Sequence, residues 1–120
     1  MSVELGTTLR CYYPPRHIWI VLSKPEQNDG KFLFVNLTTV GGSCQERACV
    51  LTPADYSDLD GDSTVAYSRS HVGNVSALEE AIQKGLFTPL NPLPGAALTK
   101  VIEAAKTSPH VSAVKRALLP

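Results

Sequence analysis

His17–Ser23 (HIWIVLS) and Lys31–Thr39 (KFLFVNLTT), separated by KPEQNDG, form the stretch of sequence that decides the fold. Both apolar runs are rich in β-branched and aromatic residues, and Asn28, Asp29 and Gly30 tolerate the positive φ angles of a tight turn. The pattern therefore predicts an antiparallel hairpin. Apolar side chains occupy both faces of each strand, which is typical of strands in the middle of a small barrel or beneath a helix.

Three further segments before residue 75 have strand character. Thr7–Tyr13 is expected to be a strand that ends at Pro14, because proline cannot donate to a ladder. Arg47–Leu51 and Ser63–Val72 are expected to add two more short strands. About five strands with short connections favour a mainly β fold with C-terminal helices, an α+β architecture built on a small SH3-like or OB-like β-barrel.

Residues 76–120 follow helical rather than strand spacing. Ser76 and Glu79 match a capping box, which predicts a helix over Ala77–Lys84 that stops at Gly85. Later helical segments are expected over Gly95–Lys106 and within Ser112–Leu119. We therefore expect a single domain over residues 1–120, with a β-barrel over 1–75 and a helical C-terminal appendage over 76–120.

The composition narrows the classes of function that the protein can have. The 120 residues carry 11 basic and 11 acidic side chains, and 43% of them are hydrophobic. Zero net charge removes the bulk-charge argument for nucleic-acid binding, so any such site must be a local patch. No apolar run approaches the roughly 18 residues of a membrane helix, and MSVELGTTLR lacks the layout of a secretory signal. These features predict a soluble, cytoplasmic protein that has no membrane contact.

The residues that commonly bind metals do not follow a metal-binding pattern. Cys11, Cys44 and Cys49 are odd in number and contain no C-x-x-C pair, so they suit reduced thiols better than disulfides or zinc ligands. Asp58–Asp62 is acidic, but its glycine is fourth rather than sixth and the twelfth residue is Arg69 instead of glutamate, unlike a calcium-binding EF-hand loop. We therefore expect no metal and no cofactor.

Four segments follow one another along the chain: Leu5–Leu9 (LGTTL), Arg16–Ser23 (RHIWIVLS), Phe34–Thr39 (FVNLTT) and Ser63–Tyr67 (STVAY), the last followed by Leu78. In this order they resemble the PemK/MazF family of toxin endoribonucleases from bacterial toxin–antitoxin systems. These segments are similar to the family's opening G-D-x-W/V strand, its R-P-V-x-V-x-S strand, its V-x-P-[IL]-T-[ST] strand and its S-V-V-L-x segment. The resemblance implies an SH3-like barrel.

The same resemblance implies metal-independent cleavage of single-stranded RNA, in which the neighbouring 2′-hydroxyl is the nucleophile. The position of the family's second catalytic arginine is His71 in this chain, with Arg69 two residues earlier, and the proline of R-P-V is His17. A catalytic set of Arg16, Arg69 and His71 then supplies phosphate stabilisation and an acid or base. In an extended strand Arg69 and His71 project to one face.

Candidate substrate-binding residues are Thr38, Thr39 and Tyr13, since hydroxyls bind phosphate and aromatic rings stack on bases. We expect His17 to pack at a strand end beside Trp19. The partners that the resemblance implies are RNA, an antitoxin-like protein and a second copy in a homodimer. The alternative is a non-catalytic SH3-like module that binds a protein or peptide, which the neutral net charge favours.

Overall fold

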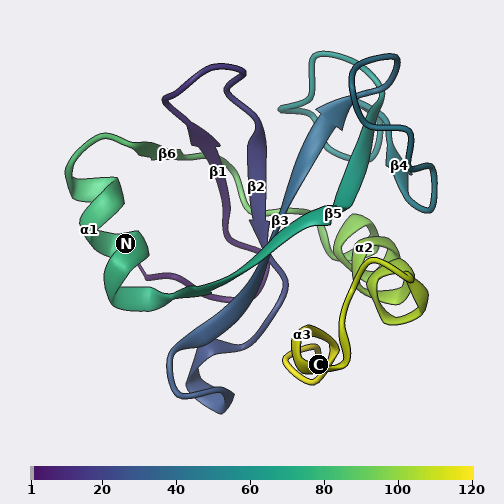
Figure 1. Ribbon diagram of the computed structural model, residues 1–120. Helices are drawn as coiled ribbons and strands as arrows, with labels where there is room; N and C mark the ends of the chain where they lie inside the picture. The colour runs from purple at the N-terminus through teal and green to yellow at the C-terminus, as the bar shows by residue number, and fades with distance from the viewer. Residues whose placement is uncertain (1) are drawn as a thin grey trace.

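A six-stranded antiparallel sheet curls into a half-barrel in the computed structural model, which describes residues 2–120 (Figure 1). The strands are β1 (Thr8–Cys11), β2 (Ile18–Val21), β3 (Lys31–Thr39), β4 (Val50–Leu51), β5 (Ser63–Asn74) and β6 (Phe87–Pro89). Their order across the sheet is β4-β5-β3-β2-β1-β6. The mainly β architecture with C-terminal helices is confirmed. No helix within residues 2–120 is long and apolar enough to cross a membrane.

The predicted hairpin is confirmed as β2 and β3, with Ile20 opposite Val35 in the register. A 3-10 turn, η1 (Pro25–Gln27), begins the connection. Asp29 and Gly30 end it with φ angles of 54° and 78°, in the left-handed region. The positive φ angles that the turn residues were expected to supply are therefore used here.

Apolar side chains on both faces of this hairpin pack into two separate cores. One core lies against α2 (Gly95–Thr107) and includes Ile20, Leu33 and Val35 from the hairpin. The other lies against α1 (Val75–Gln83) and includes Phe32 and Phe34. Figure 1 shows α1 on one side of the sheet and α2 with α3 (Ala113–Arg116) on the other. The pattern of strands covered on both faces is thus explained.

Strand β5 is interrupted by a large bulge. Phe34 of β3 pairs with His71 of β5, and Asn36 pairs with Ala66, so that one residue of β3 faces residues 67–70 of β5. A bulge of this size leaves backbone groups without ladder partners, which must be satisfied elsewhere.

Side chains from two distant segments satisfy the bulge. The Glu46 carboxylate accepts from the backbone N–H groups of Tyr67 at 3.0 Å and Ser68 at 3.2 Å, and from the Ser68 hydroxyl at 2.5 Å. Lys115 Nζ of α3 donates to the Ser70 carbonyl at 2.8 Å. The Tyr67 hydroxyl donates to the Val101 carbonyl of α2 at 2.7 Å, which ties the bulge to the helix.

The structure corrects two predictions about residues 76–120. Helix α1 begins at Val75, and its N-cap is Asn74, whose Oδ1 accepts from Ala77 N at 2.9 Å. The predicted capping box on Ser76 is therefore wrong, because Asn74, two residues earlier, caps the helix and asparagine is as good an N-cap as serine. The strand count is six rather than about five, since β6 was too short and too close to proline to be recognised.

Candidate functional site

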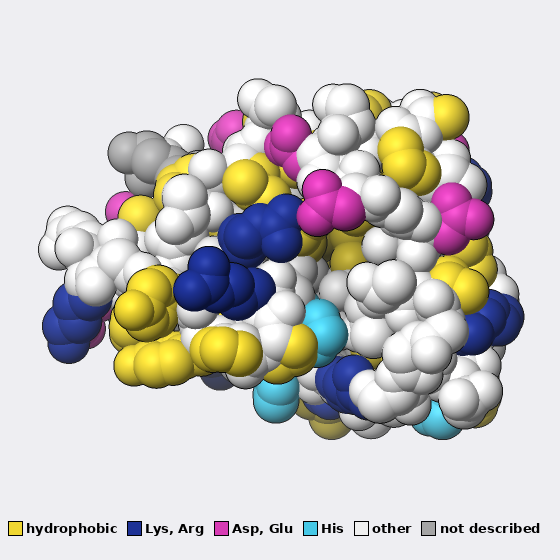
Figure 2. All heavy atoms as spheres, turned by 90° about the horizontal axis from the view of Figure 1, so that it is seen from above, with side chains coloured by type: hydrophobic (Ala, Val, Ile, Leu, Met, Phe, Trp, Pro, Cys, Tyr) yellow, Lys and Arg dark blue, Asp and Glu magenta, His cyan; other side chains and the backbone are white. Residues whose placement is uncertain are grey.

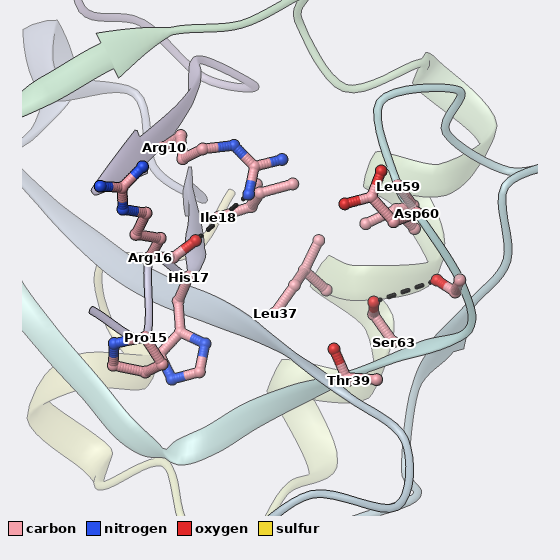
Figure 3. A pocket seen from close by; sticks show the side chains of 11 residues that line it. Arg10, Pro15, Arg16, His17, Ile18, Leu37, Thr39, Leu59, Asp60 and Ser63 are labelled. Carbon is pink, nitrogen blue, oxygen red and sulfur yellow. Dashed lines mark hydrogen bonds between the residues drawn. The ribbon is translucent and has the colours of Figure 1, made fainter. Parts of the chain in front are cut away.

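A polar cleft opens at the end of the sheet where β1, β2 and β3 meet the loop that precedes β5. It has a volume of about 180 Å³, and its lining residues include Arg10, Arg16, His17, Thr39, Asp60 and Ser63. Figure 3 shows Arg10 and Arg16 on one side of the cleft and Asp60 with Ser63 on the other, above an apolar floor at Leu37. Figure 3 shows the Arg10 guanidinium turned toward the hollow and the Arg16 guanidinium turned away from Asp60, so that Arg10 is the cation that suits the hollow to an anion.

Local contacts hold the two arginines in place. Arg10 Nη1 donates to the Arg16 carbonyl at 3.2 Å, which links β1 to the chain just before β2. Arg16 has a φ of 59°, a left-handed conformation that non-glycine residues adopt at a cost. Its guanidinium carbon lies 5.7 Å from the centre of the Tyr12 ring. The turn that presents Arg16 is therefore supported by Arg10 on one side and Tyr12 on the other.

His17 lies at the edge of this cleft and is half-buried. Burial and, after it, the nearby positive charge of Arg69 lower the pKa of His17 below its ordinary 6.5, while a backbone hydrogen bond with Leu37 acts in the opposite direction. The His17 imidazole is therefore neutral at pH 7, the form in which it can accept a proton. Arg69 is held by a bond from its Nη2 to Ser43 Oγ at 2.9 Å.

His71 lies on the face of the sheet that carries His17. Its ring centre is 5.7 Å from that of Trp19, and His17 lies two residues before Trp19, immediately before β2 begins at Ile18. Residues two apart along a strand project to one face. The structure therefore places His71 beside Trp19, and it places Arg69 near enough to His17 to lower the pKa of that imidazole.

The remaining predicted residues lie in different surroundings. Thr39 is exposed and lines the cleft, whereas Thr38 is buried and its hydroxyl donates to Asn36 Oδ1 at 3.2 Å. Tyr13 is 59% exposed, with its ring edge-on to Tyr12 at 5.5 Å. Of these three residues, Thr39 is the one that lines the cleft together with Arg10 and Arg16.

Two residues of the cleft were missed or undervalued in the sequence. Arg10 was not singled out, because only the pairing of Arg10 with Ile18 brings it next to Arg16 and His17. His17 was expected to be a packing residue. The feature of the sequence that could have indicated a site role for His17 is its position directly after Arg16 at the start of a strand, where side chains are often accessible.

Charge is unevenly distributed over this end of the molecule. Figure 2 shows basic and histidine side chains gathered on the face seen from above, with acidic side chains toward one edge. Asp60 faces the arginines, but Asp55 and Asp58 are engaged elsewhere: Asp55 accepts from Thr52 N at 2.8 Å, and Asp58 accepts from the Tyr56 hydroxyl at 3.0 Å. Asp60 is the residue of this acidic segment that lines the cleft.

The chain was also compared with known proteins. No protein-family model matches it, and no curated protein matches it at a significant level. Within residues 2–120, no three histidine, cysteine, aspartate or glutamate side chains gather as a metal ion would require. The functional argument therefore rests on the geometry of the cleft and the adjoining face.

Proposed function

We propose that this protein is a PemK/MazF-like, SH3-like barrel of the toxin type that binds single-stranded RNA and cleaves it without a metal ion. The observation that carries the proposal is the placement of Arg10 and Arg16 beside a neutral His17 in one cleft. Guanidinium groups stabilise phosphate charge, and a neutral imidazole accepts a proton at pH 7. The resemblance of the sequence to the PemK/MazF family indicates single-stranded RNA as the class of substrate.

In this proposal the 2′-hydroxyl of the substrate loses its proton to His17 and attacks the adjacent phosphorus. A bond forms between the 2′-oxygen and phosphorus while the bond from phosphorus to the 5′-oxygen breaks, which leaves a 2′,3′-cyclic phosphate. Arg10, Arg16 and Arg69 stabilise the negative charge that develops on the phosphate, and Thr39 orients it. His71 gives a proton to the departing 5′-oxygen.

The roles differ from those inferred from sequence in two respects. His17 joins the catalytic set as the base, because it lines the cleft while His71 lies beyond Trp19. Thr38 is not assigned to substrate, because its hydroxyl is bonded inside the protein. Tyr13 keeps its proposed place as a base-stacking residue on the exposed turn beside Arg16.

The test is incubation of the purified protein with long single-stranded RNA in EDTA, followed by analysis of the cut ends. We expect cyclic-phosphate ends, a loss of at least about 100-fold in rate for His17→Ala, and a similar loss for the Arg69→Ala/His71→Ala double variant. Lys106→Ala is the matched control, because Lys106 pairs with Glu103 on the exposed side of α2. Unchanged cleavage by both site variants would contradict the assignment.

The second candidate is the non-catalytic interaction module, and the exposed pair Tyr12 and Tyr13 favours it. They are 58% and 59% exposed, and adjacent exposed tyrosines are typical of surfaces that bind proteins or peptides. Folded protein that neither cuts nor binds RNA at low salt would support this module and exclude the nuclease. The proposed homodimer and antitoxin-like partner are tested by the molar mass in solution and by co-purification.

A further inference from the structure

The structure assigns a stacking site for one unpaired nucleobase to Trp19 and His71, beside a phosphate position at His17 and Arg69. This inference rests on the proposed function, since it names where a base of the bound strand lies. The site adjoins the cleft, shares His17 and His71 with the proposed catalytic set, and is separate from Tyr13.

The rings of Trp19 and His71, called the platform below, are supported by buried aromatic rings. The Trp19 ring stacks on Phe34 with 4.9 Å between centres and a 28° interplanar angle, and the His71 ring lies 5.7 Å from the Trp19 ring at 32°. Phe34 is buried and contacts the rings of Phe32 and Phe87 at 5.4 Å and 5.8 Å. The buried rings therefore prevent Trp19 and His71 from collapsing into the core.

The outer rings remain available to a ligand. His71 is exposed and Trp19 is half-buried, although tryptophan in the core of a domain is usually covered. A rigid, partly exposed pair of flat rings is the arrangement on which proteins stack the bases of single strands. The ring pair thus has the shape and the exposure that an unpaired base requires.

Positive charge adjoins the platform where a phosphate would lie. His17 precedes Trp19 by two residues, which is about 7 Å along a strand, and the Arg69 guanidinium is near enough to lower the pKa of His17. The acidic residue of the adjoining loop, Glu46, has its carboxylate engaged by Tyr67 and Ser68. Aromatic rings beside the Arg69 guanidinium and the neutral His17 imidazole match the base and phosphate of one nucleotide.

Intrinsic fluorescence reports on this site directly, because Trp19 is the one tryptophan of the chain. The protein is titrated with a short fluorophore-free deoxy strand, which has no 2′-hydroxyl and is not cleaved, and with an abasic strand of the same length. Anisotropy of labelled versions gives the affinities. We expect the base-containing strand to quench Trp19 and to bind about 5- to 100-fold more tightly than the abasic strand, which leaves Trp19 unquenched.

Variants separate this platform from other stacking residues. His71→Ala is expected to remove most of the preference for the base-containing strand, whereas His110→Ala, which replaces the other exposed histidine, leaves it intact. Strand binding with unchanged Trp19 fluorescence, equal binding of the two strands, or a preference lost in Tyr13→Ala alone would overturn the platform and leave the proposed function standing. Failure of both strands to bind would also overturn the platform, and the RNA cleavage assay would then decide the proposed function separately.

Discussion

Replacing Glu46 with alanine removes the acceptor that holds the β5 bulge, and the structure allows the effect to be worked out. The Glu46 carboxylate accepts three hydrogen bonds, two from backbone N–H groups of Tyr67 and Ser68 and one from the Ser68 hydroxyl. Tyr67 is fully buried and Ser68 is exposed. Water can therefore replace the carboxylate at Ser68 but not at Tyr67.

The magnitude follows from the buried group. A buried donor that loses its partner costs about 1–3 kcal/mol, and the exposed bonds add little once water replaces them. We expect Glu46→Ala to lower the free energy of unfolding by about 2 kcal/mol. For a domain of this size a loss of about 2 kcal/mol corresponds to a fall in Tm of about 8 °C.

The assay is thermal and guanidinium unfolding followed by near-ultraviolet circular dichroism. Glu26→Ala is the control, since Glu26 is an exposed carboxylate on η1 without a partner in the bulge. Glu46→Gln keeps one acceptor oxygen and is expected to recover most of the stability. A Glu46→Ala protein as stable as the Glu26→Ala protein would refute the reasoning, because the buried N–H would then have found another partner.

The pH dependence of the free energy of unfolding tests the hydrogen bonds of Glu46 in a second way. Partial burial alone would raise the pKa of Glu46, but hydrogen bonds from the Ser68 hydroxyl and backbone and from Cys44, together with the charge of His110, bring it below its ordinary 4.5. The stabilising contribution is therefore complete above pH 4.5 and is lost as the pH falls through the lower, folded-state pKa. The stability difference between wild type and Glu46→Gln should shrink over that range.

Three further predictions concern single residues. The imidazole of His17, followed by NMR, should titrate with a midpoint below 6.5, and a midpoint above that value would contradict its partial burial beside a cation. Asn74→Ala should lower the free energy of unfolding, measured with a chemical denaturant, by about 1 kcal/mol, and Ser76→Ala should lower it much less. The reverse order would show that Ser76, rather than Asn74, caps α1. Gly73→Ala places a Cβ 2.7 Å from the Phe32 ring and should cost about 1–3 kcal/mol, whereas wild-type stability would show that the ring moves freely.

Much of the fold could be read from local patterns. The hairpin over β2 and β3 followed from two β-branched runs and a turn with residues that accept positive φ, and α2 begins at Gly95 as expected. Strand β6 could not be recognised, because its three residues pair with β1 across a long stretch of chain and carry no alternation of their own. Tertiary pairing, rather than propensity, makes this segment a strand.

The site was harder to predict than the fold. Arg16 and Thr39, which were candidates from the sequence, share the lining of the cleft, whereas the predicted common face of Arg69 and His71 stays a prediction. Arg10 required the register of β1 against β2, and the surroundings of Thr38 required the knowledge that its hydroxyl meets Asn36. Sequence spacing indicates which face of a strand a residue occupies, but not which neighbours reach it from other strands.

The late position of β6 and α2 in the sequence has a consequence for how the chain folds as it is synthesised. The edge strand beside β1 and the helix that covers the first core, with Val101 and Ala105 buried in it, come from the last third of the chain. The ribosome releases the hairpin well before these residues exist, so that its apolar face stays exposed to chaperones or to other nascent chains. The sheet and its first core can therefore be completed only after residues 87–107 have been synthesised.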